Sequence, residues 1–249
     1  FDWVVLYGED TNFNGTLDTS ENDGDANFPP DNQDGVLDYG LAHFVTIYSY
    51  DPNTTGTGAK RVNVNRATDA ELKSTVGKQV STAQMDELLK RRKTAPLTSV
   101  GDLLDIKNWT EEAARKVLDL ITVHDNEYVP GVININTAPR EVLKALPDID
   151  EGTANKMIEF RTTTEENLSD IGWVLRVIGK NKFKRIANFI SVRSNQFMIQ
   201  SVGRAPGSPV FARLKVVVDR ASKPWKVLYW KDISDLGVPY VEDAPDSQR

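Results

Sequence analysis

Segments with strand-forming apolar residues mark both ends of the chain, whereas a helical spacing of apolar positions marks its middle. Their content of β-branched and aromatic residues predicts strands at 3–6, 43–49, 196–202, 212–218 and 225–230. Turns containing proline or glycine separate the last three segments, which predicts an antiparallel meander. Between residues 60 and 193 apolar residues recur about every 3.6 positions, so short helices are expected there.

The helical middle contains one unit twice. The phrase Val62-Asn63-Val64-Asn65-Arg66-Ala67 returns as Ile133-Asn134-Ile135-Asn136-Thr137-Ala138, a shift of 71 residues. At a shift of 69, further apolar positions correspond as far as Tyr128 and Phe197. Capping residues such as Thr68 begin short helices within the unit. We expect the asparagines of both phrases to bond backbone groups that lead into the first helix. The predicted shared interior comprises Leu88, Leu89, Val117, Leu120, Ile121, Leu143, Leu146, Met157, Ile158, Ile186 and Ile190.

Acidic residues are concentrated near the start of the chain. Residues 9–38 hold nine acidic side chains and neither Lys nor Arg, while the whole chain has a formal net charge of -6. The remainder therefore carries only a slight positive surplus, which is too weak to indicate a nucleic-acid surface. The charge asymmetry points instead to a cation.

Residues 10–21 predict a structural Ca²⁺ site, because they match the pattern D-x-[DN]-x-[DN]-G-x5-E at every specified place. Gly15 permits the sharp turn that this pattern needs. The alternative is that Asn, Asp and Gly only form turns here, but a bound ion would relieve the repulsion between the carboxylates. The flanking sequence does not form an EF-hand helix pair, so we expect a structural ion and not a switch. The predicted ligands are Asp10, Asn12, Asn14, the Thr16 carbonyl, Asp18 through water, and Glu21.

A second acidic phrase supplies a weaker set of ligands. Residues 32–38 repeat the Asn-x-Asp-Gly-x-Leu-Asp phrase, but Pro30 stands where the first ligand should fall. The carboxylates of Asp31, Asp34 and Asp38 would either form a degenerate second site or contribute to the first ion or to a neighbour.

The second copy of the helical unit resembles the helix-hairpin-helix domain, in which hairpin amides grip a nucleic-acid phosphate. That family carries two glycines after Leu-Pro, whereas here Leu146-Pro147 is followed by Asp148-Ile149-Asp150. Negative charge thus stands where phosphate would sit. The basic cluster Lys90-Arg91-Arg92-Lys93 is explained by a solvated helix end. DNA binding is therefore the alternative function, and nucleic acid is not the expected partner.

The arrangement as a whole resembles the type II secretion minor pseudopilin family called general secretion pathway protein K. The residues that carry this resemblance are Ile133 to Leu143, Ala154 to Arg161, and Val192-Arg193-Ser194-Asn195-Gln196-Phe197. It implies an α+β fold, in which a small antiparallel pilin-like sheet is interrupted by a large helical insertion of two helix-hairpin-helix-like units. It also implies calcium binding and a structural role, in which the protein caps the tip of a pseudopilus together with other minor pseudopilins. The soluble part would be periplasmic, with an upstream leader and an apolar helix anchoring it in the inner membrane.

Composition argues against an enzyme. The chain has no cysteine and only His43 and His124 as imidazoles, so neither thiol catalysis nor a structural zinc site is expected. It has no nucleophile elbow, P-loop or dinucleotide fingerprint. Carboxylate pairs such as Asp148 and Asp150 are common on solvated turns, and an unrecognised hydrolase is the remaining enzymatic alternative. No run approaches the roughly 20 apolar residues that span a bilayer.

These expectations divide the chain into four segments. Residues 1–59 would carry the first strand or strands and the acidic calcium-binding loop, and residues 60–128 and 129–193 would form helical repeats 1 and 2. Residues 194–249 would add the C-terminal strands that complete the pilin-like sheet.

Overall fold

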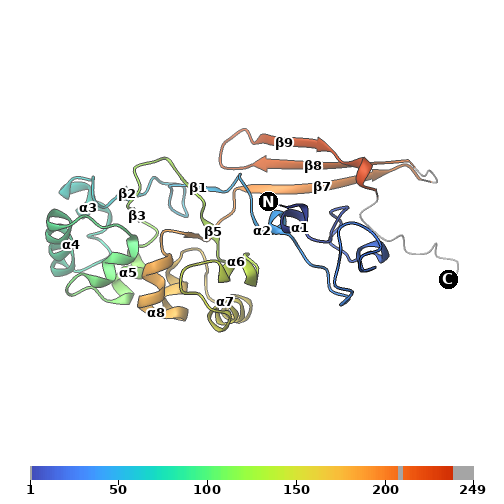
Figure 1. Ribbon diagram of the computed structural model, residues 1–249. Coiled ribbons are helices and arrows are strands. Elements are labelled where there is room, and N and C mark those ends of the chain that lie inside the picture. Colours follow the sequence, from blue (N-terminus) through green and yellow to red (C-terminus); the bar gives the residue numbers. More distant parts are fainter. Residues whose placement is uncertain (1, 207–209, 238–249) are drawn as a thin grey trace. The chain divides into compact units, whose positions relative to one another are not determined.

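The computed structural model describes residues 2–206 and 210–237, and its mixture of helices and small sheets confirms the α+β class (Figure 1). The chain separates into two compact units. Unit 1 comprises residues 1–48 and 196–249, and unit 2 comprises residues 49–195. Unit 2 is thus inserted into the sequence of unit 1. In the described part of the chain, no helix combines the length and apolar character needed to cross a bilayer.

Unit 2 contains two copies of one helical repeat, as the repeated phrase at residues 62–67 and 133–138 predicts. Repeat 1 runs through β2 (Val62–Asn63), α3 (Asp69–Thr75), α4 (Thr82–Thr94), η2 (Val100–Asp105), α5 (Glu111–Val117) and β3 (Ile121–Thr122). Repeat 2 runs through β5 (Ile133–Asn134), α6 (Arg140–Lys144), α7 (Glu151–Thr163), α8 (Gly172–Ile186) and β6 (Ile190–Ser191). Gly179 inside α8 has φ 77° and ψ 166°, so α8 consists of two short helices that correspond to η2 and α5.

Each repeat begins and ends at one pair of short parallel strands. Val62 lies opposite Ile121 in the β2–β3 pair, and Ile133 lies opposite Ile190 in the β5–β6 pair. A third small sheet in this unit pairs β1 (Tyr50–Pro52) with β4 (Tyr128–Pro130) in antiparallel fashion. The first and last residues of each repeat are therefore held together by backbone hydrogen bonds.

The helices of the repeats begin at side-chain caps that the sequence contains. Thr68 and Glu71 form a capping box at α3, and Ser81 and Gln84 form another at α4. Thr110 accepts a hydrogen bond from the backbone at the start of α5. The apolar faces of these helices form one core with those of repeat 2, and the predicted interior residues all belong to it or pack against it.

Unit 1 contains a three-stranded antiparallel sheet in the order β7-β8-β9, which confirms the predicted meander. Its strands are β7 (Gln196–Arg204), β8 (Phe211–Asp219) and β9 (Lys226–Asp232), and η3 (Ser234–Leu236) follows the last of them. The first part of unit 1 adds α1 (Trp3–Tyr7), η1 (Thr19–Glu21) and α2 (Leu41–Phe44).

Two predicted strands are wrong. Residues 3–6 lie in α1, where the Asp2 carboxylate accepts a hydrogen bond of 2.6 Å from the Trp3 amide and so caps the helix. Residues 43–49 begin in α2, and residues 45–49 belong to no strand. Their β-branched and aromatic residues suit a strand, but no neighbouring segment among the described residues pairs with them, and composition cannot supply that partner.

Candidate calcium-binding loops

The first acidic loop, residues 10–21, folds around its own side-chain oxygens. The Asp10 carboxylate accepts hydrogen bonds from the amides of Asn14 at 2.9 Å and Gly15 at 3.0 Å. Asn12 Oδ1 accepts from the Asn14 amide at 2.9 Å, and Asn14 Oδ1 accepts from the Thr16 amide at 2.7 Å. Gly15 has φ 75°, a conformation that glycine adopts without a steric penalty. The side chains at the first, third and fifth positions of the predicted loop therefore converge.

The end of this loop returns to its beginning. The Glu21 carboxylate accepts hydrogen bonds from the Thr11 amide at 2.8 Å and from the Asp18 amide at 3.1 Å. Asp18 Oδ2 accepts from Asn12 Nδ2 at 2.6 Å and from Asn14 Nδ2 at 2.9 Å. Glu21 is only 3% exposed and Asp10 only 6% exposed. All five predicted side-chain ligands thus lie in one hydrogen-bonded loop, and the remaining position, Thr16, lies in the same turn.

The second acidic phrase repeats this backbone geometry at a distance of twenty residues. Asn32 Oδ1 accepts from the Asp34 amide at 2.9 Å, and Asp34 Oδ1 accepts from the Val36 amide at 2.8 Å. Gln33 has the same φ of 56° as Phe13, and Gly35 has φ 74°. Asp31 accepts hydrogen bonds from the amides of residues 23, 24 and 33. The second loop is therefore a structural copy of the first, although it lacks the first position of the motif.

Glu9 belongs to the second loop, although motif matching does not find it. Its Oε2 accepts a hydrogen bond of 3.0 Å from the Asp38 amide, just as Glu21 accepts one from the equivalent Asp18 amide at 3.1 Å. Glu9 is 5% exposed. Burial raises the pKa of its carboxyl, and the nearby charges of Asp38, Asp31 and Asp34 raise this pKa further, while the hydrogen bond from the Asp38 amide opposes them. Glu9 thus fills the place of the missing final glutamate, from 29 residues earlier in the chain.

Arg213 on β8 anchors the first loop to the sheet. This side chain is fully buried, and its guanidinium donates hydrogen bonds to the carbonyl oxygens of Asn12 at 2.8 Å and Phe13 at 2.6 Å. It also donates to Gln200 Oε1 at 2.7 Å. The sequence gives no sign of this contact, because the donor and acceptors are 200 and 201 residues apart.

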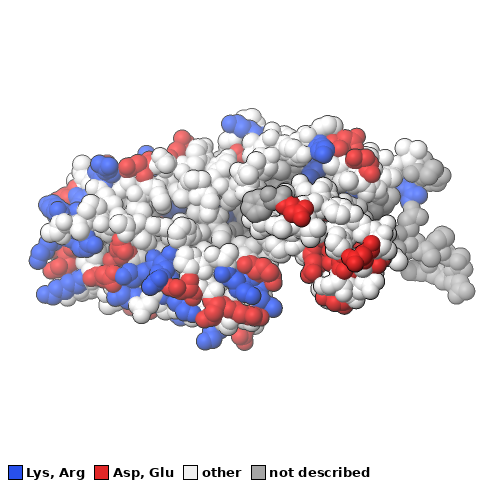
Figure 2. Space-filling model, viewed as in Figure 1, with Lys and Arg blue, Asp and Glu red and all other residues white. Residues whose placement is uncertain are grey.

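Acidic side chains gather over these loops without basic residues between them, whereas the helical repeats display both signs of charge (Figure 2). Across the described ranges, no group of three or more His, Cys, Asp or Glu side chains is arranged as a ready metal cluster. Half of the predicted ligands in the first loop are asparagine or threonine, and the carboxylates of Asp10 and Glu21 face loop amides. Calcium binding at these loops is therefore a prediction.

The hairpin of repeat 2 is capped by its own carboxylate. Asp150 accepts a hydrogen bond of 2.7 Å from the Thr153 amide at the start of α7, and Lys182 Nζ lies 3.3 Å from the other carboxylate oxygen. Hydrogen bonds from Thr153, assisted by Lys182, lower the pKa of this carboxyl to about 2. The neighbouring Asp148 forms an ion pair of 2.8 Å with Arg185. An ionised carboxylate thus occupies the helix start where a phosphate would bind, which argues against the DNA-binding alternative.

The asparagines of the repeated phrase bond backbone groups. Asn63 and Asn134 accept hydrogen bonds from amides that lead into the first helix, as predicted, whereas Asn65 and Asn136 bond the backbone elsewhere in their repeats. Asn65 exchanges two hydrogen bonds with the backbone of Leu97, at 2.8 and 2.9 Å. Asn136 donates to the Leu168 carbonyl at 2.9 Å and accepts from the Trp173 indole at 3.1 Å. The equivalent arginines Arg92 and Arg161 each donate to two backbone carbonyls at the start of their repeats.

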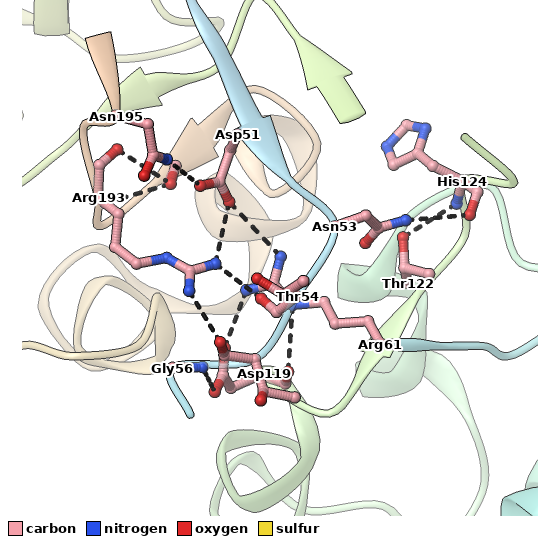
Figure 3. A network of polar contacts seen from close by, with 12 residues as sticks. Asp51, Asn53, Thr54, Gly56, Arg61, Asp119, Thr122, His124, Arg193 and Asn195 are labelled. Atoms are coloured by element: carbon pink, nitrogen blue, oxygen red, sulfur yellow. Dashed lines mark hydrogen bonds and ion pairs between the residues drawn. The ribbon is translucent and has the colours of Figure 1, made fainter. Parts of the chain in front are cut away.

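A polar network joins the chain segments that enter and leave unit 2 (Figure 3). The buried Asp51 carboxylate accepts hydrogen bonds of 3.2 Å from both Arg193 and Asn195. Arg193 also donates to the Thr54 carbonyl at 2.7 Å, while Arg61 pairs with Asp119 at 2.9 Å. We call the contacts of Asp51 with Arg193 and Asn195 the root clasp.

Comparison with known protein families gives one match, and it covers repeat 2. Residues 133–193 match the family model described as type II secretion system (T2SS), protein K. No curated protein and no solved structure matches the chain. The matched segment begins at β5, ends two residues beyond β6, and includes both Asn136 and the capped hairpin. This match supports the assignment of the chain to the type II secretion system protein K family.

Proposed function

We propose that the chain is the periplasmic part of a minor pseudopilin that caps the tip of a type II secretion pseudopilus with other minor pseudopilins. The observation that carries this proposal is the match of residues 133–193 to protein K of that system. The family match points to a structural secretion component and not to an enzyme. The inserted helical unit adds bulk to the subunit, and such bulk suits a subunit on which nothing further is stacked.

The assembly role is tested by copurification of the full chain with two companion minor pseudopilins. We expect a ternary complex that survives gel filtration. A chain that joins no complex but retards DNA at physiological salt, with the retardation lost on Lys90→Glu and Arg91→Glu, would replace this proposal by the DNA-binding alternative.

We also propose that the two acidic loops hold Ca²⁺ as a structural ion. The first site would use Asp10, Asn12, Asn14, Thr16, Asp18 and Glu21, and the second would use Asp31, Asp34 and Asp38 with Glu9 in the position of the final glutamate. The support is the shared loop geometry, together with the hydrogen bonds that Glu9 and Glu21 accept from equivalent amides. An ion would also offset the mutual repulsion of the acidic side chains.

Thermal unfolding of the full chain with excess calcium and with a chelator tests the ion. A ligand at about 100 times its dissociation constant stabilises the folded state by roughly 2.7 kcal/mol, so calcium should raise the midpoint for unit 1. Glu21→Gln and Glu9→Gln should each reduce this rise, because each removes a carboxylate charge from one loop. The exposed Glu165→Gln in unit 2 is the matched control. Equal midpoints in calcium and in chelator would contradict the proposal.

A further inference from the structure

A groove of about 710 Å³ lies within unit 1, along one face of the sheet. Aromatic rings line much of it, contributed by Tyr7, Phe13, Tyr39, Phe44 and Tyr229. Apolar side chains from the sheet and from η3 also line it, together with polar and charged ones such as Gln200. A groove of this size with mixed apolar and polar walls could hold a short peptide segment or a comparable ligand.

Two lysines on adjacent strands face this groove, and neither has a carboxylate partner among the described residues. Lys215 of β8 lies directly opposite Lys231 of β9 in the strand register, and both line the groove. Like charges directly opposite each other destabilise a sheet. Over the residues that the structure describes, neither ammonium group forms an ion pair, and the Lys215 ammonium lies 5.6 Å from the centroid of the Phe13 ring.

The positive charges around these two lysines favour the binding of an anion. Burial lowers the pKa of Lys215, and the positive charges of Arg213 and Lys231 lower it further. Asp10 is the acidic residue among those that line the groove, but both of its carboxylate oxygens accept hydrogen bonds from loop amides. A carboxylate placed between the lysines would relieve their repulsion, and the surrounding rings would contact an apolar neighbour.

We propose that this groove docks a carboxylate-bearing peptide segment and that its occupant is residues 238–249 of the same chain. That segment carries Glu242, Asp243 and Asp246 against the single Arg249, and its apolar residues Tyr240 and Val241 directly precede the acids. Its charge is therefore complementary to the lysine pair, and its aromatic residue matches the lining.

The point where this segment begins also favours it as the occupant. Leu236 lines the groove and Gly237 follows it, so the described part of the chain ends beside the groove. An extended chain covers roughly 3.3–3.6 Å per residue, so the four or five residues to Glu242 and Asp243 reach about 15 Å along the groove. A short connection also gives the segment a high effective concentration at the groove compared with a segment from another molecule.

Hydrogen exchange tests this docking when it is measured in the full chain and in variants with reversed charges on the lysines and on the segment. We expect the amides of residues 240–243 to exchange at least about tenfold more slowly than in the unfolded chain. Lys215→Glu with Lys231→Glu should abolish this protection. Adding Glu242→Lys and Asp243→Lys to that variant should restore the protection, because the ion pairs form again with the two signs of charge interchanged.

Two further variants separate docking from misfolding. Lys215→Met removes the half-buried charge but keeps an apolar stem, and it should weaken protection while the exchange of sheet amides stays unchanged. Lys226→Glu, on the same strand as Lys231 but outside the groove, should leave protection intact. Carbodiimide coupling should join Lys215 or Lys231 to Glu242 or Asp243 within one chain. Unprotected amides in the native chain, equal protection in all variants, or coupling only between chains would each overturn the proposal.

Discussion

Two asparagines, Asn65 and Asn136, occupy equivalent places in the two repeats and satisfy backbone groups that no helix or sheet ladder reaches. That they bond backbone groups could be predicted from the repeated phrase, because a polar residue kept twice within an apolar pattern is typical of a backbone contact. Their partners could not be predicted, since Leu97 and Leu168 lie 32 residues further along the chain. Glu9 could not be predicted in this way, since it lies outside the motif and 29 residues from the amide that it binds. Arg213 could not be predicted either, because its partners lie in a distant loop.

Replacing Asn136 by alanine should destabilise unit 2 by about 1–3 kcal/mol. The change leaves the carbonyl of Leu168 and the indole N–H of the buried Trp173 without their partner. Hydrogen exchange of the core amides of unit 2 measures this loss. The exposed Asn155→Ala on α7 serves as the control, and an equal loss in both variants would contradict the structural role of Asn136.

The charge on Asp150 should stabilise α7 in a way that depends on pH. Because the folded-state pKa of this carboxyl is lowered from 3.8 to about 2, its stabilising effect is complete above pH 4 and is lost as the pH falls toward 2. NMR titration of the Asp150 carboxyl carbon gives this pKa directly. In Lys182→Met we expect the pKa to move back toward the ordinary value, since the ion pair of 3.3 Å is gone. A carboxyl that titrates in the native chain as in an unfolded peptide would contradict this account.

At the scale of elements, the sequence predicts the helices and the meander, and it fails where an element needs a partner. Caps and apolar spacing are local, so the starts of α3, α4 and α5 follow from Thr68, Ser81 and Thr110. The segment 43–49 has the composition of a strand, but pairing depends on what lies beside it. Ile47, at 91% exposure, shows that strand-forming composition alone buries nothing.

The first acidic loop should loosen when its anchor on β8 is removed. Arg213→Met keeps the buried stem but leaves the carbonyl oxygens of Asn12 and Phe13 without their donor, which should cost roughly 1–3 kcal/mol. We expect faster proteolysis within residues 10–21 and faster exchange of the Asn14 and Gly15 amides. Lys226→Met, an exposed change on β9, is the matched control. Unchanged cleavage of the loop in Arg213→Met would show that the loop holds its conformation without β8.

At the scale of the whole molecule, the chain is one unit interrupted by another, and the root clasp closes the inserted one. Strand-forming segments near both ends of the sequence predict this interruption, because the repeated helical phrase lies wholly between them. The clasp itself could not be predicted, since Asp51 and Asn195 are 144 residues apart and neither belongs to a motif.

Asp51→Asn should open the root of unit 2. The substitution removes the carboxylate that accepts from Arg193 and Asn195, and we expect a loss of about 1–3 kcal/mol. This is less than the roughly 3–5 kcal/mol for a fully buried pair, because Arg193 is 28% exposed. Hydrogen exchange should rise at residues 51–56 and 193–195 while the helical core stays protected. Asp86→Asn, exposed on α4, controls for the lost charge. If Asp51→Asn and Asp86→Asn showed equal hydrogen exchange at both segments, the root clasp would be refuted.

The clasp also has a consequence for the order in which the protein folds during synthesis. Arg213 reaches the carbonyl of Asn12 across 201 residues, so the first acidic loop waits for its anchor until residue 213 has left the ribosome. Closing so long a loop as a flexible chain would be slow. Unit 2 is complete before residues 196–213 emerge, and once it has folded, its clasped ends shorten the loop between Asn12 and Arg213. The folded insertion then lowers the entropic cost of bringing the two parts of unit 1 together.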